Sequence, residues 1–147
     1  MSSAGDLAVA EARKWIGTPY VHQASRCGAG CDCLGLLRGV WRSLYGREPE
    51  RVPRYSPDWD EPQHGEILWQ AARRHLRAVP EGSGLPGDVL LFRMRTGAVA
   101  KHLGLVSRIE DARFIHAYAG HGVIESPLSH PWRRRIVARF RFPVLPR

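Results

Sequence analysis

Residues 30–45 read GCDCLGLLRGVWRSLY, a stretch in which a glycine-bearing loop passes into an amphipathic helix. Four apolar residues at the spacing i, i+3, i+4 and i+7 form one stripe along this helix: Leu37, Val40, Trp41 and Leu44. Gly46 stands where a C-terminal cap is expected. Cys33 therefore lies in the first turn of the predicted helix, and Asp32 before it suits the helix start as a cap.

This position makes Cys33 a candidate nucleophile. A thiol is a useful nucleophile only as thiolate, and the free backbone N–H groups at a helix start favour negative charge. The sequence therefore predicts a lowered pKa for Cys33. The alternative is a buried cysteine that serves only packing, as most cysteines do.

Further helices are expected on both sides of this one. Residues 6–16 carry apolar side chains at helical spacing, with Asp6 as the cap and residues 17–19 (Gly-Thr-Pro) as the stop. Another helix is predicted through residues 68–76. Between the helix that ends near Gly46 and the one at residues 68–76, residues 47–62 hold four prolines and predict a long surface excursion.

Beyond Pro80 the apolar pattern changes from helical to alternating. Strands are predicted over residues 89–94, 102–109, 114–118, 123–125 and 135–142. Helices followed by antiparallel strands define an α+β class, and the length fits one domain over residues 1–147.

Two histidines fall on neighbouring predicted strands. His102 and Gly104 share one face of their strand, and the small glycine leaves room beside the imidazole. A two-residue turn between the strands would place His116 opposite Leu105, and the two imidazoles would then point to opposite faces. Cooperation between them therefore requires a bulge or an odd-length loop between residues 109 and 114.

A nucleophile at a helix start, a base on a strand and an orienting residue on the next strand form the arrangement of cysteine hydrolases. Cys33, His102 and His116 fit these three roles. The other five histidines receive no role: His22, His64, His75, His121 and His130.

Five blocks of sequence extend this pattern over most of the chain. They read GTPY at residues 17–20, GCDCLGL at 30–36, PGDVLLF at 86–92, HLGLV at 102–106 and FIHA at 114–117. In order and spacing these blocks resemble the NlpC-type bacterial cell-wall peptidases. The resemblance implies a papain-like core with helices packed on an antiparallel sheet, and a reaction without cofactor or metal. It assigns Cys33 as nucleophile, His102 as general base, His116 as orienting residue and Tyr20 as a hydroxyl near the thiol or oxyanion.

The resemblance also implies a substrate and a setting. The family cleaves peptide bonds of peptidoglycan stems, often between D-glutamate and a diamino acid. Leu34 stands where many members have serine, and Cys27 and Cys31 are additional thiols in the approach loop. With Leu34 and the continuation at residues 37–41, the chain looks most like peptidases of phage tail modules and gene transfer agents. Other tail-tip or baseplate proteins are then the expected partners.

The first 17 residues lack the apolar core of a signal peptide, and no apolar run approaches 18 residues. Synthesis in the cytoplasm and no membrane span are therefore expected. A phage-like particle would carry the enzyme to the periplasm and wall of the host cell.

The formal charge is +8, and only Lys14 and Lys101 are lysines among the 22 basic residues. Residues 132–147 hold six arginines and no acid. This basic segment and the excursion at residues 47–62 are candidate docking surfaces, with ordinary solvated surface as the alternative. No nucleic-acid motif is present, so no specific nucleic-acid partner is expected.

Two other functions are open at this stage. Cys27, Cys31 and Cys33 with a histidine offer four ligands to zinc, although the spacing C-x3-C-x-C lacks a second pair. The other alternative is a non-catalytic structural or binding component of a tail assembly.

Overall fold

The computed structural model describes residues 3–51, 66–82 and 84–145. In chain order the elements are α1 (Ala4–Lys14), β1 (Ser25–Arg26), β2 (Gly30–Cys31), α2 (Cys33–Tyr45), α3 (Ile67–His75), β3 (Arg77–Ala78), β4 (Val89–Phe92), β5 (His102–Arg108), β6 (Arg113–Tyr118), β7 (Gly122–Pro127), α4 (His130–Arg133) and β8 (Ile136–Arg141). Helices precede a set of antiparallel strands, so the predicted α+β class is confirmed. No helix within these described ranges has the length and apolar character needed to cross a membrane.

The first helix begins two residues earlier than predicted, because Ser3 and not Asp6 is its cap. The Ser3 hydroxyl accepts a hydrogen bond from the Asp6 backbone N–H at 3.0 Å, and the Asp6 carboxylate accepts one from the Ser3 N–H. Asp6 is therefore the reciprocal partner in a capping box rather than the cap itself.

The second helix begins and ends as the sequence predicts. Asp32 accepts a hydrogen bond from the Gly35 N–H at 2.7 Å, and Gly46 closes the helix with a φ of 84°. The two N-terminal helices meet where Trp15 lies against Gly39. A Cβ at that glycine would lie 2.1 Å from the indole ring, so this close contact requires glycine.

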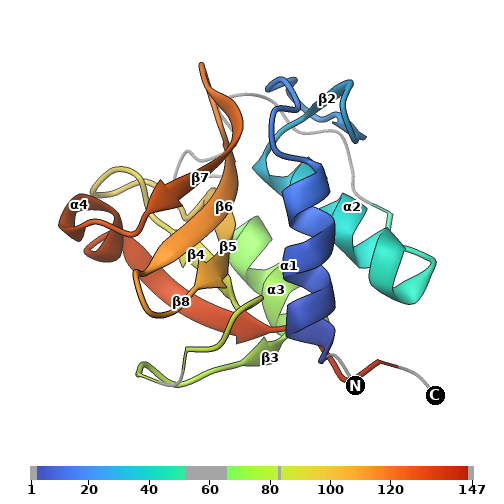
Figure 1. Ribbon diagram of the computed structural model, residues 1–147. Helices are drawn as coiled ribbons and strands as arrows, with labels where there is room; N and C mark the ends of the chain where they lie inside the picture. The colour runs from blue at the N-terminus through green and yellow to red at the C-terminus, as the bar shows by residue number, and fades with distance from the viewer. Residues whose placement is uncertain (1–2, 52–65, 83, 146–147) are drawn as a thin grey trace.

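The large sheet has the strand order β3-β8-β4-β5-β6-β7, and every neighbouring pair is antiparallel. Figure 1 shows α1 and α2 on one side of this sheet and α4 on the other. The main core lies between the sheet and the N-terminal helices. A smaller cluster fills the opposite face beneath Trp132 of α4, and it consists of Leu90, Phe92, Val106 and Phe114.

A β-bulge in β5 brings the two candidate histidines onto one face. The strands leave their four-residue loop with Arg108 opposite Arg113, a register that would place Leu105 opposite His116. Between Val106 and Arg108 the register shifts by one residue, and Leu105 then faces Ile115. The predicted bulge is therefore present, but it lies within β5 and not in the loop at residues 109–112.

An ion pair between a buried carboxylate and a partly exposed guanidinium joins the start of β4 to β8. Asp88 is 2% exposed, and its two carboxylate oxygens accept hydrogen bonds from the Arg141 guanidinium at 2.8 and 3.0 Å. The Leu85 N–H donates to the same carboxylate at 2.9 Å. This contact holds the turn before β4 against β8, the last strand in the chain.

Asp88→Ala is expected to lower the free energy of unfolding by roughly 2 kcal/mol, because it removes the carboxylate that accepts hydrogen bonds from Arg141 and from the Leu85 N–H. Urea denaturation followed by circular dichroism measures the loss. The matched control is Asp111→Ala, which removes an exposed carboxylate from its pairs with Arg108 and Arg113 and is expected to cost less than about 1 kcal/mol. Equal losses in the two variants would contradict the importance of this ion pair.

Four elements were not predicted from the sequence. The loop before α2 contains the hairpin formed by β1 and β2, β3 adds a short strand at the edge of the sheet, and α4 precedes β8. Most of the predicted excursion at residues 47–62 lies outside the described residues. Of the basic segment, residues 132–145 are described and form part of α4 and β8.

Candidate active site

A cavity of about 430 Å³ opens between the start of α2 and the sheet. Cys33 and Tyr20 line its helical side, and His102 lines the side formed by β5. The remaining lining residues are His22, Asp32, Leu34, Met94, Arg95, Lys101, Ala117, Tyr118 and Ala119. Three of the four predicted site residues thus share one cavity, and the fourth, His116, contacts His102.

The thiol of Cys33 is buried at the helix start. Its side chain donates a hydrogen bond to the Lys101 carbonyl, with Sγ 3.3 Å from the oxygen. Burial raises the pKa of Cys33 to about 12, and the Asp32 carboxylate adds to the shift. Backbone hydrogen bonds from Leu103 and Leu34 act in the opposite direction but do not outweigh burial. The lowered pKa expected from the helix start is therefore wrong for this state of the protein.

The two histidines form a hydrogen-bonded line that continues to a serine. His102 Nε2 lies 2.8 Å from His116 Nδ1, and His116 Nε2 lies 2.9 Å from Ser126 Oγ. These side chains come from β5, β6 and β7, which are neighbours in the sheet. Because Nε2 of His102 is engaged by His116, Nδ1 is the ring nitrogen that remains for the thiol.

Aromatic side chains pack around His102 and His116 and shield both imidazoles from solvent. Burial lowers the pKa of His102 to about 3, with His116 and Lys101 as further causes, and burial lowers the pKa of His116 to about 4. Phe114 stacks on His116 with ring centroids 4.1 Å apart, and Trp132 packs near both imidazoles. Both imidazoles are therefore neutral at neutral pH.

Glycine beside the imidazole is required, as predicted. A Cβ on Gly104 would lie 2.8 Å from the Phe114 ring and 3.0 Å from the Cβ of His116. A larger residue at position 104 would therefore push His116 of β6 away from His102 of β5.

The free energy of unfolding is expected to fall as the pH drops below about 6.5. Both buried imidazoles have folded pKa values below the ordinary value, so in this range the unfolded chain binds protons that the folded chain does not. Each histidine then contributes a slope of up to about 1.4 kcal/mol per pH unit, with the greater stability on the alkaline side. Urea denaturation at about pH 7, 6 and 5 measures this slope.

The matched variants separate the buried groups from the exposed ones. His116→Gln removes one buried titrating group and is expected to reduce the slope by about half. His130→Gln changes an exposed histidine and is expected to leave the slope intact. An unchanged slope in His116→Gln would contradict a neutral buried imidazole.

Tyr20 lies at the edge of the cavity. It is 36% exposed, and its backbone forms a parallel bridge with Cys31. Burial, followed by the nearby Cys33, raises the pKa of Tyr20, so its hydroxyl keeps its proton. A protonated hydroxyl on the cavity wall can donate a hydrogen bond to a substrate oxygen.

The three cysteines have separate environments. Cys31 is fully buried in β2, Cys27 is exposed and donates to the Lys14 carbonyl, and all three thiols are free. Across residues 3–51, 66–82 and 84–145, no three His, Cys, Asp or Glu side chains group so that they could hold a metal ion. The zinc alternative therefore receives no support from the described residues.

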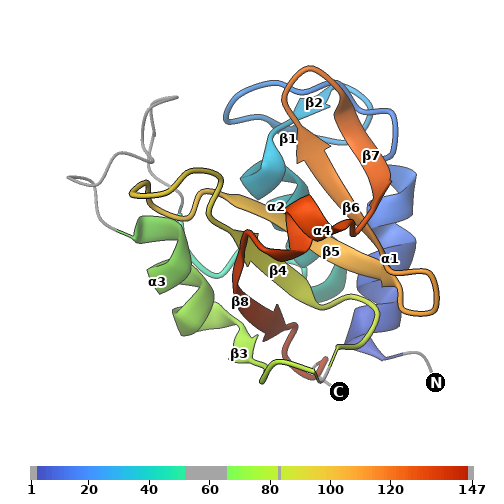
Figure 2. The same cartoon turned by 90° about the vertical axis from the view of Figure 1, so that its left-hand side faces the viewer.

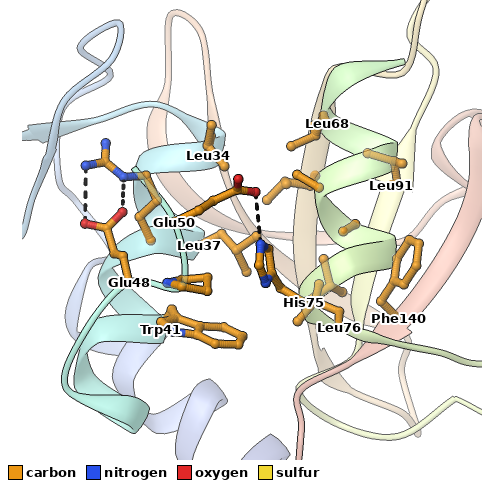
Figure 3. A pocket seen from close by; sticks show the side chains of 16 residues that line it. Leu34, Leu37, Trp41, Glu48, Glu50, Leu68, His75, Leu76, Leu91 and Phe140 are labelled. Carbon is orange, nitrogen blue, oxygen red and sulfur yellow. Dashed lines mark hydrogen bonds and ion pairs between the residues drawn. The ribbon is translucent and has the colours of Figure 1, made fainter. Parts of the chain in front are cut away.

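A second, narrow cavity of about 90 Å³ lies between α2 and α3 and is almost wholly apolar. Figure 3 shows Leu34 of α2 and Leu68 of α3 on opposite sides of it, with His75 hydrogen-bonded to Glu50 at the rim. Leu34 lines this cavity and the one that holds Cys33. The leucine that replaces the common serine therefore packs toward α3.

Ser126 was missed from the sequence, because the predicted strand ended at Glu125. In the structure β7 continues through Pro127, and Ser126 faces Phe114 on the neighbouring strand. Extending the alternating pattern by one residue would have placed the hydroxyl on the face of His116.

Comparisons with known proteins extend the likeness to the whole domain. A model of the NlpC/P60 family matches residues 17–141. The murein DD-endopeptidase MepS/murein LD-carboxypeptidase of Escherichia coli is 29% identical over 122 residues, covering 82% of this chain and 54% of that protein. The gamma-DL-glutamyl hydrolase of Bacillus subtilis is 30% identical over 135 residues, covering 91% of this chain and 28% of that protein. The chain thus spans about half or less of the length of these two relatives.

Two solved structures share the fold at low sequence identity. NlpC2 from Trichomonas vaginalis superposes with a TM-score of 0.70 at 20% identity, covering 97% of this chain and 47% of that one. The NlpC/p60 domain of the peptidoglycan hydrolase SagA superposes with a TM-score of 0.62 at 23% identity, covering 94% and 98%.

Proposed function

The chain belongs to the NlpC/P60 family, and on that premise we propose that it is a cysteine peptidase that hydrolyses peptidoglycan stem peptides. The predicted papain-like fold is confirmed by the family match and the shared fold of its solved members. One observation carries the activity: Cys33 and His102 line the same cavity, and His102 is held by His116 at 2.8 Å. The names of the relatives, a murein endopeptidase among them, support the substrate class.

In the proposed mechanism the resting pair is a neutral thiol and a neutral imidazole. Nδ1 of His102 takes the proton from Cys33 as the sulfur attacks the carbonyl carbon of the scissile bond. The imidazolium then gives this proton to the leaving amine, and water hydrolyses the thioester with His102 again as base. The Tyr20 hydroxyl and the first backbone N–H groups of α2 stabilise the oxyanion.

His116 and Ser126 set the tautomer that this role requires. His102 is basic at Nδ1 only when its proton is on Nε2, and that proton is then donated to His116 Nδ1. The proton of His116 must accordingly be on Nε2, where the hydroxyl of Ser126 accepts it at 2.9 Å. His116 is thus a positioning residue, and Ser126 fixes its orientation.

Digestion of purified peptidoglycan followed by mass analysis of the released fragments tests the reaction and the bond together. Fragments cut within the stem peptide are expected, and we propose the bond between D-glutamate and the diamino acid as the one cleaved. Intact stem peptides after digestion with folded protein would remove the proposed function. Cuts at another stem-peptide bond would remove only the proposed specificity.

The finer proposal is that this enzyme is a component of a phage-like tail tip and opens the wall of a host cell. It is supported by the resemblance of Leu34 and residues 37–41 to tail-module peptidases. Attachment to a particle would raise the effective concentration of the enzyme at the wall. Purified particles are expected to contain the chain in fixed copy number at one end of the tail. Recovery of the chain only as free protein would contradict the tail role without affecting the peptidase chemistry.

A further inference from the structure

A third cavity, of about 400 Å³, is lined mainly by arginine. Its lining residues are Arg93, Met94, Arg95, Thr96, Arg134, Arg135 and Val137. Four of these seven carry a guanidinium group, and none carries a carboxylate. An arginine-rich wall of this kind is suited to hold an anion, because guanidinium groups form strong charge-assisted hydrogen bonds with carboxylate and phosphate oxygens.

The fold gathers these arginines from two distant parts of the chain. The Arg93 backbone N–H, just after β4, donates to the Arg135 carbonyl, just before β8, at 2.8 Å. In Figure 2 the start of β8, which follows α4, lies at the end of β4, where Phe92 pairs with Ile136. Arg134 and Arg135 are thereby placed beside the residues that leave β4.

Arg93, on one wall of the cavity, is held in place by contacts within the protein. Arg93 donates to the Glu66 carboxylate at 2.6 Å, and its guanidinium lies 6.0 Å from the centre of the Trp69 ring. Glu66 also accepts a hydrogen bond from the Ala100 N–H at 2.8 Å, which holds the carboxylate in place. The lining of the cavity brings four guanidinium groups together and contributes no carboxylate, and a bound anion would reduce the repulsion among these groups.

The arginine cavity is a neighbour of the candidate active site. Met94 and Arg95 line both cavities, one of which also holds Cys33 and His102. A peptide bound in the catalytic cavity would therefore have the arginine cavity beside it, within reach of an anionic group on the same molecule.

We propose that the arginine cavity is a binding subsite for a free carboxylate of the peptide whose scissile bond lies at Cys33. This inference rests on the proposed function and names a feature of its substrate. Stem peptides carry carboxylates on their acidic residues and at their carboxyl end. The subsite would discriminate in favour of peptides in which the carboxylate is free and against those in which it is amidated.

The test compares two synthetic stem peptides that differ only in whether one carboxylate is free or amidated. The wild-type protein is expected to prefer the free acid by roughly tenfold in kcat/KM, mainly through KM, because a charge-assisted hydrogen bond is lost with the amide. The double variant Arg134→Gln/Arg135→Gln is expected to lose this preference, because its kcat/KM for the free acid falls to its value for the amidated peptide. The control Arg139→Gln lies on β8, lines another cavity, and is expected to keep the preference.

Binding measurements keep the inference separate from the catalytic proposal. Calorimetric titration of Cys33→Ala with both peptides reports the subsite whether or not the peptides are cleaved. Tighter binding of the free acid, lost in the arginine double variant, supports the subsite even if no hydrolysis occurs. One peptide pair is tested for each carboxylate of the stem peptide. Equal affinity within every pair, or a preference that survives the double substitution, overturns the proposed subsite.

Discussion

Cys33→Ala is expected to lower peptidoglycan hydrolysis by about 10⁴-fold or more, because the sulfur is the proposed attacking atom and no other group replaces it. The free energy of unfolding is expected to change little, since the substitution removes one sulfur atom and its weak hydrogen bonds. Release of soluble stem fragments, followed by mass analysis, measures the activity. Circular dichroism confirms that the variant is folded.

Cys31→Ser is the matched control for the loss of a thiol. Cys31 is two residues from Cys33 and is also buried, but it lies in β2, outside the lining of the catalytic cavity. Its serine variant is expected to retain activity within about threefold, since no chemical step uses this sulfur. Comparable turnover by Cys33→Ala and the wild type would instead favour the non-catalytic tail component.

The sequence predicted well those features that depend on neighbouring residues. The apolar stripe, the cap at Asp32 and the glycine at position 46 are local signals, and they placed Cys33 at the start of α2. The requirement for a bulge was also predictable, because the register of a two-residue turn would place His102 and His116 on opposite faces, and a shift of one residue places them on the same face. Its place within β5 was not, since a bulge leaves the alternating pattern nearly unchanged.

Features that depend on tertiary packing were beyond the sequence. The helix start alone predicted a lowered pKa for Cys33, whereas the sheet that covers the thiol produces the burial that raises it. The arginine cavity requires β4 and β8 to be neighbours, although residues 93 and 135 are far apart in the chain. No local spacing signals such a contact.

His102→Gln is expected to lower kcat/KM by roughly 10³-fold, because it removes the base that takes the proton from Cys33. The residual activity then depends on thiolate formed without assistance. Since burial holds the pKa of Cys33 at about 12, this activity is expected to rise about tenfold per pH unit across the neutral and mildly alkaline range. Fluorogenic stem-peptide hydrolysis measured at several pH values follows this rise.

His116→Gln separates the base from the residue that positions it. This variant keeps His102 but loses the partner 2.8 Å from Nε2, so a smaller loss of roughly 10- to 100-fold is expected. Its pH profile should remain close to that of the wild type, because the proton acceptor is still present. The wild type, with a His102 pKa of about 3, should retain its neutral base down to mildly acidic pH while the chain is folded. A His102→Gln variant with the pH profile of the wild type would show that another group removes the thiol proton.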